Sequence, residues 1–251
     1  MKTTTSAIAW LALASLAFGN EISESQKKFI GQYEKHPVVA PEKAMLNTDA
    51  EPELADGFTS LYNGKDLDGW VSRGGKCEFE ADGGEIIGRT VAGQPSTYLC
   101  TEREDFADFV FTVEVKWESP MNSGVMFRAQ RRMEKKGGRE IEVVYGPQAE
   151  MEGFSNSANR NWSGGLYWQS DGGWKYPVWL EAHKEARAAL KEGEWNRLTI
   201  LAKGKSLKTW LNGLPVANLE DGQYLKGAIG LQVHAGKRGV VRFRNVKVKE
   251  L

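Results

Sequence analysis

Three short stretches of the sequence place acidic, amide, cationic and imidazole side chains at the spacing of β-strands. In VYGPQAEME (144–152), Gln148 and Glu150 are two residues apart, so both side chains share one face of a strand. Arg128 alternates with apolar residues in SGVMFR, and GLQVHAG puts Gln232 and His234 on one face. A carboxylate, a guanidinium and an imidazole could supply a base, an oxyanion partner and a proton donor. Each of these residues alone also fits a solvated strand face.

Strands must position these side chains, and the chain from residue 57 onward has a strand-like pattern. FVFTVEVKW (109–117) alternates aromatic or branched residues with polar ones, which predicts a half-buried strand. Asn212-Gly213 predicts a tight hairpin turn. One helix, short and exposed, is predicted at 180–193. Many short strands with turn-like spacing predict an all-β fold in which two antiparallel sheets pack as a sandwich. Further strands are expected at 123–130, 139–146, 164–169, 196–204, 206–211, 214–220, 228–236 and 240–250.

The composition favours a carbohydrate ligand and argues against nucleic acid. The chain has 33 basic and 33 acidic residues and no basic stripe, so a nucleic-acid partner is not expected. It also has nine Trp and 28 Gly. Indole rings stack on the C–H faces of sugars, although Trp is more often a core residue.

The N-terminus has the features of a secretory signal peptide. Lys2 precedes an apolar run at 7–18, which is too short to span a bilayer, and small residues precede a cleavage point after Gly19. We therefore expect a signal peptide at 1–19, an extended lead-in segment at 20–56, and a single domain at 57–251. The expected location is periplasmic or extracellular, with no membrane span.

Cys77 and Cys100 are the only cysteines. In an oxidising compartment an even pair favours a disulfide, and both cysteines flank a predicted hairpin. Two buried thiols remain the alternative. Two cysteines and three scattered histidines do not form a zinc motif. The sequence requires no cofactor, and it leaves open whether a divalent metal ion takes part.

Six motifs, in order, are similar to those of the 3-keto-disaccharide hydrolase domain family. They are GFTSLYNGKDLDGW (57–70), NSGVMFR (122–128), VYGPQAEME (144–152), WSGGLYWQSDGGW (162–174), GEWNRLTILAKGKSLKTWLNGLPVANLED (193–221) and GLQVHAGKRGVVRFRNVKVKEL (230–251). The resemblance covers almost all of 57–251. It implies a concanavalin A-like jelly-roll sandwich, export, and a sugar substrate with a carbonyl at C3.

That carbonyl makes the hydrogen on C2 acidic. A base can remove it, the enolate can expel the group at C1, and water can add to the resulting enone. The resemblance thus suggests Glu150 as the base, Arg128 as the partner of the enolate oxygen, and His234 as the acid or a sugar-binding donor. Further predicted substrate contacts are Gln148, Tyr167, Gln232 and Glu142, with Trp162 and Trp174 as stacking surfaces.

Three other functions remain compatible with the sequence. A direct glycosidase would use two carboxylates, although the acid-rich motif of glucanases is not evident around Glu140 and Glu142. A non-catalytic, lectin-like module would need only amides and an aromatic platform, and the fold alone does not separate it from an enzyme. A purely structural domain is the third alternative.

Overall fold

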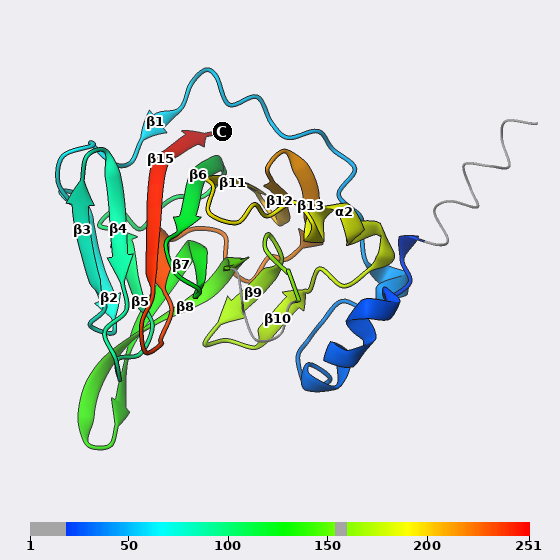
Figure 1. Cartoon of the computed structure of the whole chain (residues 1–251), viewed down its shortest axis with the longest axis horizontal. Helices are drawn as coiled ribbons and strands as arrows, with labels where there is room; N and C mark the ends of the chain where they lie inside the picture. The colour runs from blue at the N-terminus through cyan, green and yellow to red at the C-terminus, as the bar shows by residue number, and fades with distance from the viewer. Residues whose placement is uncertain (1–18, 154–159) are drawn as a thin grey trace, which may run out of the picture.

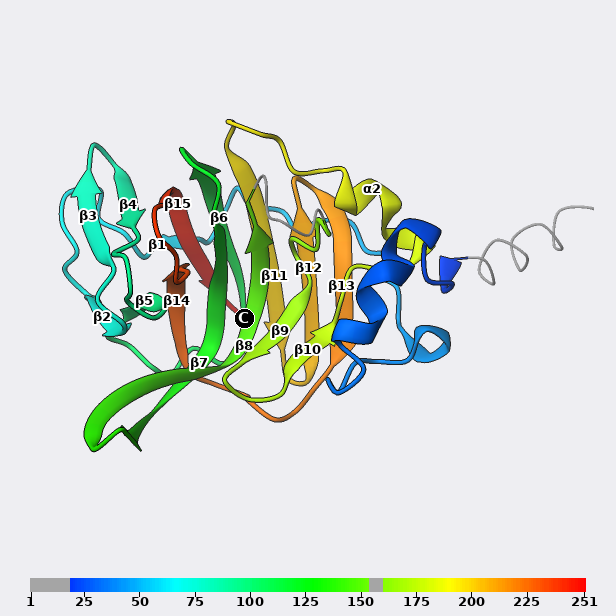
Figure 2. The same cartoon turned by 60° about the horizontal axis from the view of Figure 1, so that its bottom comes forward.

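The computed structural model describes residues 19–153 and 160–251, which form two antiparallel sheets packed face to face (Figures 1 and 2). The predicted two-sheet sandwich with one short helix is confirmed. The predicted signal peptide at 1–19 lies, apart from Gly19, outside the described residues. Among those residues, no helix has the length and apolarity needed to cross a membrane.

The first sheet has eight strands. Along the sheet the order is β13 (Leu214–Glu220), β12 (Ser206–Leu211), β11 (Asn196–Lys203), β6 (Phe109–Trp117), β15 (Val240–Glu250), β4 (Glu85–Arg89) and β3 (Glu78–Asp82), and β1 (Thr59–Ser60) pairs with β15. The turn between β12 and β13 is the predicted hairpin, with positive φ at Asn212 (51°) and Gly213 (85°). The predicted strand at 109–117 is β6, which is buried along most of its length because it is central in this sheet.

The second sheet has seven strands and carries Gln148, Glu150 and Gln232. Its order is β10 (Gly173–Tyr176), β9 (Leu166–Gln169), β8 (Arg139–Glu152), β7 (Asn122–Lys136), β14 (Ala228–Val233), β5 (Thr97–Thr101) and β2 (Trp70–Gly74). The β7–β8 hairpin extends beyond the rest of the sheet (Figure 2). The helical elements are short: the 3-10 helices η1 (Glu24–Gln32), η2 (Pro41–Lys43) and η3 (Glu181–His183), and α2 (Lys184–Arg187).

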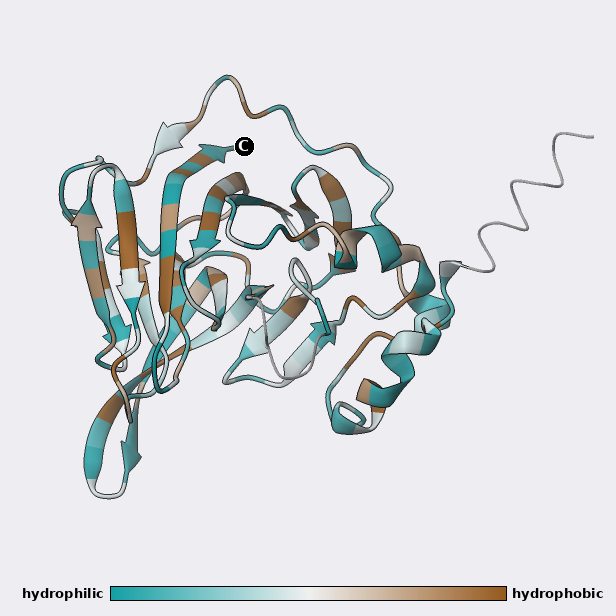
Figure 3. Ribbon diagram, viewed as in Figure 1, coloured by the Kyte–Doolittle hydropathy of each residue, from teal (hydrophilic) through white to brown (hydrophobic). Residues whose placement is uncertain are grey.

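The core lies between the two sheets, and alternation along each strand decides which side chains enter it. In β14, Ile229, Leu231 and Val233 belong to the core, whereas Gln232 points to the outer face. In β8, Ala149 and Met151 point inward. Hydrophobic and hydrophilic bands alternate along the strands in Figure 3. The outer face of the seven-stranded sheet is therefore free to carry polar groups.

The lead-in segment lies along the domain rather than forming a second core. Helix η1 lies beside β10, and the following chain crosses the molecule to reach β1 (Figure 1). On the way, Asn47 donates a hydrogen bond to the carbonyl of Thr209 (3.0 Å), and Glu51 pairs with Arg197. These contacts tie the extended segment to β11 and β12 of the eight-stranded sheet.

The predicted disulfide is wrong. Cys77 and Cys100 are free, buried thiols that belong to different apolar clusters. Cys77 lies in the core between the sheets, whereas Cys100 lies on the outer face of β5 with Tyr98 and Met126. Burial raises the pKa of the Cys100 thiol to about 12, against the opposing charge of Arg73.

Arg128 is not positioned to meet a ligand on the outer face. It has positive φ (49°) where the β7–β8 register shifts, so its side chain leaves the strand alternation. Its guanidinium is fully buried and donates to the carbonyls of Ala107 (2.8 Å), Gly204 (2.8 Å) and Tyr224 (3.2 Å) and to Asp108 (3.2 Å). Arg128 therefore joins three loops, and its predicted catalytic role is corrected to a structural one.

We expect protein unfolded without reductant to react with two equivalents of an alkylating reagent, because both thiols are free. In the folded protein both should react slowly, since they are buried. Mass spectrometry before and after alkylation measures this. A mass two hydrogens below the dithiol form, with no alkylation, would restore the disulfide.

We expect Arg128→Met to lower the free energy of unfolding by about 3–5 kcal/mol, because it leaves several buried carbonyls and Asp108 without their cation. Arg132→Met is the matched control on the same strand. Its half-exposed side chain pairs with Glu134, so Arg132→Met should lower the free energy of unfolding by no more than about 1 kcal/mol. Urea unfolding measures both. An Arg128→Met protein of wild-type stability would contradict the structural role.

Candidate functional site

A polar cavity of about 310 Å³ opens on the outer face of the seven-stranded sheet. Predicted site residues from four strands line this cavity: Gln148 and Glu150 of β8, Tyr167 of β9, Trp174 of β10 and Gln232 of β14. His234, just after β14, lines its rim. The other lining residues are Tyr33, His36, Asn122, Arg160 and Gln169.

The floor of the cavity is a cross-strand row of side chains. Tyr98 pairs with Gln232, Gln232 with Gly124, and Gly124 with Glu150, each on a neighbouring strand. Gly124 leaves room for the side chain of Gln148, since a Cβ there would lie 2.5 Å from the Gln148 Nε2. Gln148 thereby spans the row between Gln232 and Glu150.

The amides in this row form a relay that ends at a carboxylate. Gln232 Nε2 lies 3.2 Å from both the Tyr98 hydroxyl and Gln148 Oε1, and Gln148 Nε2 donates to Glu150 Oε2 (2.7 Å). Asn122 Nδ2 donates to the other carboxylate oxygen of Glu150. The relay fixes the orientation of the carboxylate, because each of its oxygens accepts from an amide on a different strand.

Burial dominates the electrostatics of Glu150. It raises the pKa of the Glu150 carboxyl to about 7, against the opposing hydrogen bonds from Asn122 and Gln148. Such a group exchanges its proton near neutral pH, as a general base must. The Oδ1 of Asn122 is buried and lacks a hydrogen-bond partner in the part of the chain that the structure describes. It could accept from a ligand hydroxyl.

A buried ion pair lies beside this carboxylate. Glu152 follows on the same face of β8 and pairs with Arg160, and its other oxygen accepts from the backbone N–H of Trp162 (3.0 Å). Burial and the charge of Glu150 raise the pKa of Glu152, whereas hydrogen bonds from the backbone of Trp162 and Asn161 act in the opposite direction. Burial lowers the pKa of Arg160 to about 10, which leaves it charged at neutral pH. Arg160 is thus the cation that lines the cavity.

Aromatic rings form one side of the cavity. Trp174 and Tyr167 line it with their ring centroids 5.5 Å apart. Trp162 is fully buried beneath Trp174, at 4.9 Å, and its Nε1 donates to Gln26 (2.8 Å). The prediction that Trp162 offers a stacking surface is therefore wrong. This indole supports the wall from behind.

His234 stands at the exposed rim of the cavity. Its Nδ1 lies 2.8 Å from the carbonyl of Ala235, which can only accept, so Nδ1 carries the hydrogen of this bond. The imidazole is therefore held at the entrance, away from the amide relay.

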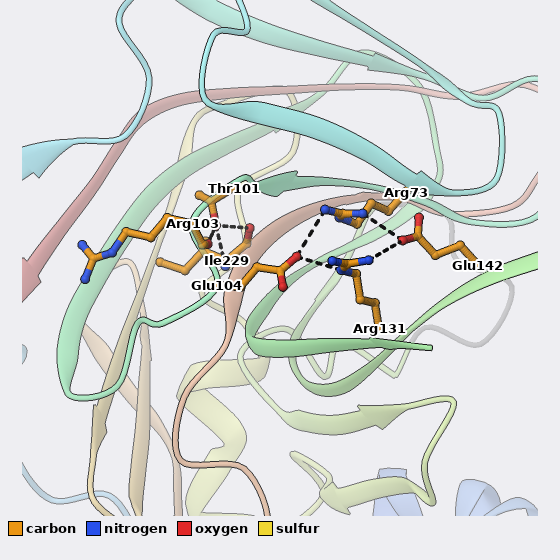
Figure 4. A network of polar contacts seen from close by, with 7 residues as sticks. All are labelled: Arg73, Thr101, Arg103, Glu104, Arg131, Glu142 and Ile229. Carbon is orange, nitrogen blue, oxygen red and sulfur yellow. Dashed lines mark hydrogen bonds and ion pairs between the residues drawn. The ribbon is translucent and has the colours of Figure 1, made fainter. Parts of the chain in front are cut away.

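Glu142 does not reach the cavity, and its predicted place in the site is corrected. It lies eight residues before Glu150 on β8, where its carboxylate is 2.8 Å from Arg73 and 3.7 Å from Arg131. Glu104 bonds to the same two arginines (Figure 4). This cluster of four charges joins β2, β7 and β8 near the base of the long hairpin, and Glu142 contacts both arginines through Oε1.

Several residues in or beside the cavity were not predicted from the sequence. Asn122 and Glu152 had a local signal, because Asn122 opens the NSGVMFR motif and Glu152 continues the i, i+2 spacing of Gln148 and Glu150. Tyr33, His36 and Arg160 had none. They reach the site from the lead-in segment and from a loop, where no strand period applies.

In the described parts of the chain, 19–153 and 160–251, no group of three or more His, Cys, Asp or Glu side chains is arranged to hold a metal ion.

Two packed antiparallel sheets with a polar, aromatic-sided cavity on one of them define a β-sandwich of the jelly-roll class. The chain matches the family described as the 3-keto-alpha-glucoside-1,2-lyase-like domain over residues 57–249, and it belongs to this family. The resemblance inferred from the six motifs is confirmed. No curated protein matches the chain in sequence.

Solved structures show the same fold at low identity. A candidate glycosyl hydrolase from Parabacteroides distasonis is 20% identical, with a TM-score of 0.51 over 82% of this chain and 100% of the other. A protein of unknown function with a galectin-like fold, from Bacillus subtilis, is 14% identical, with a TM-score of 0.56 over 80% of this chain and 98% of the other. At these identities the similarity concerns the fold alone.

The raised pKa of Glu150 predicts a pH-dependent loss of stability. The carboxyl ionises near 4.5 in the unfolded chain and near 7 in the fold, so between these values only the unfolded state releases the proton. We expect the free energy of unfolding of the wild type to fall by about 3 kcal/mol relative to Glu150→Gln as the pH rises from about 4.5 to 7, and then to level off.

Urea unfolding of both proteins at several pH values measures this difference. Glu140→Gln, an exposed change on the same strand, should show no such trend. A constant difference between the wild type and Glu150→Gln at all pH values would mean that Glu150 titrates normally.

Proposed function

We propose that this protein is a carbohydrate-active enzyme that cleaves 3-keto glycosides, with Glu150 as the base that removes the C2 proton. Family membership supports a carbohydrate-related function. The observation that carries the finer proposal is the buried Glu150 carboxyl, with a pKa of about 7, at the end of an amide relay inside a polar cavity. We further propose export through the segment at 1–19, which would bring the site to extracellular glycosides.

The proposed reaction is an elimination followed by hydration. The Glu150 carboxylate takes the proton from C2, and the C–H electron pair moves toward the C3 carbonyl to give an enolate. The enolate then reforms the carbonyl and expels the oxygen substituent at C1, which leaves as an alcohol after protonation. The product is an enone, to which water can add.

Glu150 has the properties that this step needs. A base works best when its pKa is close to the working pH, and burial provides that value here. Two amide donors hold the carboxylate in one orientation, so little reorganisation is needed at the moment of proton transfer. The free Oδ1 of Asn122 adds an acceptor beside the base for a sugar hydroxyl.

Arg160 takes the role first assigned to Arg128. Its guanidinium lines the cavity, carries a charge at neutral pH, and has a buried Nε without a partner among the described residues. A cation fixed in a water-poor site stabilises an enolate oxygen more than it stabilises a neutral carbonyl. His234, at the rim, is the proposed donor to the leaving oxygen; because its Nδ1–H bonds to Ala235, the proton would come from Nε2 of the imidazolium form.

Direct hydrolysis by two carboxylates fits the site less well. Glu150 and Glu152 point the same way from one strand, whereas the two acids of a glycosidase flank the bond that they cleave. Glu152 is also engaged by Arg160 and by the backbone of Trp162.

A non-catalytic carbohydrate-binding module is the second candidate. The amides of Asn122, Gln148 and Gln232 beside Tyr167 favour it, because amides match hydroxyl groups and a partly exposed aromatic ring can pack against a sugar ring. The buried carboxylate distinguishes the two candidates, since sugar binding alone does not need a group that titrates near pH 7.

We expect Glu150→Gln to lower kcat for a nitrophenyl 3-keto-glucoside by at least about a hundredfold, because it removes a positioned proton acceptor. Release of nitrophenol measures turnover. Wild-type reactions stopped early in heavy water should also show deuterium at C2 of recovered substrate or product, which direct hydrolysis would not introduce.

Glu140→Gln, which changes an exposed carboxylate on the same strand, should keep wild-type turnover. Comparable cleavage of plain and 3-keto glucosides by the wild type would favour direct hydrolysis. Binding of both sugars without turnover of either would identify a binding module, and full activity in Glu150→Gln would remove Glu150 as the base.

A further inference from the structure

Two residues of the cavity come from outside the family-matched region. Tyr33 and His36 lie just after η1, in the lead-in segment, whereas the family match begins at residue 57. We call these two residues the N-terminal wall. The wall closes the side of the cavity next to β10.

The segment that carries the wall is anchored at several points. Gln26 accepts a hydrogen bond from Trp162 Nε1 (2.8 Å), and Phe29 packs into the core with its ring edge-to-face with Trp162. Backbone bonds join Ser23 to Trp179 (2.9 Å) and Val39 to Lys175 (3.1 Å). Because anchors precede and follow the wall, Tyr33 and His36 have fixed positions.

The ring of His36 is oriented by the backbone of β10. Its Nδ1 lies 2.9 Å from the backbone nitrogen of Trp174, which can only donate, so Nδ1 is the acceptor. Gly173 permits this approach: it has φ of +80°, and a Cβ there would lie 2.3 Å from Nδ1. The bond assigns the hydrogen of the neutral imidazole to Nε2.

The Nε2 hydrogen of His36 is left for a ligand. Nε2 has no hydrogen-bond partner among residues 19–153 and 160–251, although the ring lines the cavity and is only partly exposed. The rings of Tyr33 and Tyr167 are its neighbours, with centroids 5.2 and 6.5 Å from that of the imidazole. A single neutral donor beside aromatic rings suits an uncharged oxygen on a sugar ring.

We propose that His36 is a substrate-binding residue: its Nε2–H donates to a hydroxyl or carbonyl oxygen of the glycosyl ring, and Tyr33 packs against that ring. The lead-in segment thereby completes a site that the family-matched domain builds only in part. This inference rests on the proposed function, because it assigns the same cavity to a sugar. His36 holds the substrate and moves no proton.

The test uses two replacements that each keep one nitrogen position of the imidazole. In His36→Asn, the side-chain oxygen can still accept from the Trp174 N–H, but the donor at Nε2 is lost. We expect KM for the 3-keto-glucoside to rise about three- to tenfold, the scale of one neutral hydrogen bond, with kcat within about twofold. His36→Gln restores a donor near Nε2, and KM should recover at least in part.

Lys35→Ala and Glu34→Ala, two exposed residues of the same turn, are the matched controls and should leave KM unchanged. All variants are compared well below their melting temperatures, so that loss of folded protein does not imitate weak binding. A wild-type KM in His36→Asn would overturn the proposal, and so would a rise in KM that is equal in His36→Gln and His36→Asn. Either result would mean that the N-terminal wall supports the fold but does not bind the substrate.

Calorimetric titration with plain and 3-keto glucosides separates this proposal from the proposed function. If the wild type binds sugar without turnover, the enzyme proposal fails, but a weaker Kd in His36→Asn would still support the binding role. Equal Kd values would overturn it. Absence of binding of both sugars to the wild type would overturn both proposals.

Discussion

The carboxylates of Glu150 and Glu152 lie side by side on one strand and are both buried. Removing a carboxylate from water costs several kcal/mol of folding free energy unless hydrogen-bond donors or a cation compensate it. Much of the site follows from this constraint. Asn122 and Gln148 supply amide donors to the first, and Arg160 supplies a cation to the second. The lack of a side chain at Gly124 lets Gln148 reach across the row. The arrangement resembles a preorganised reaction site more than a solvated sheet face.

The two kinds of compensation have different chemical consequences. Neutral amides orient Glu150 but do not cancel its charge, so burial still raises its pKa to about 7. Glu142, on the same strand, contrasts with this: Arg73 and Arg131 contact its carboxylate, and it belongs to the charged cluster of Figure 4 rather than to the cavity. A carboxylate with amide partners can act as a base near neutral pH, whereas one that two guanidinium groups hold is a structural element.

The site also depends on chain that lies outside the family-matched domain. Residues before 57 could have been a mere spacer, yet Phe29 and Gln26 dock against Trp162, and His36 bonds to the backbone of β10. The indole that was expected to meet sugar is instead the anchor for this segment. Burying Trp162 therefore fixes the N-terminal wall, and the wall narrows the cavity from one side.

The sequence by itself determined many of the strands, though not β2 or β10, and which of their residues share a face, because that property has a period of two and is local. Gln148 with Glu150, and the outward position of Gln232, followed from this period, and the hairpin at Asn212-Gly213 followed from the turn preference of those two residues. Only the tertiary structure decided the rest. Arg128 sits at a bulge with positive φ, where alternation fails, and its partners are carbonyls from three distant loops. Cys77 and Cys100 flank one hairpin yet lie in different layers. His36 reaches the site across more than a hundred residues of chain, and Arg160 enters it from a loop. Such contacts depend on how separate elements pack, which no local pattern encodes.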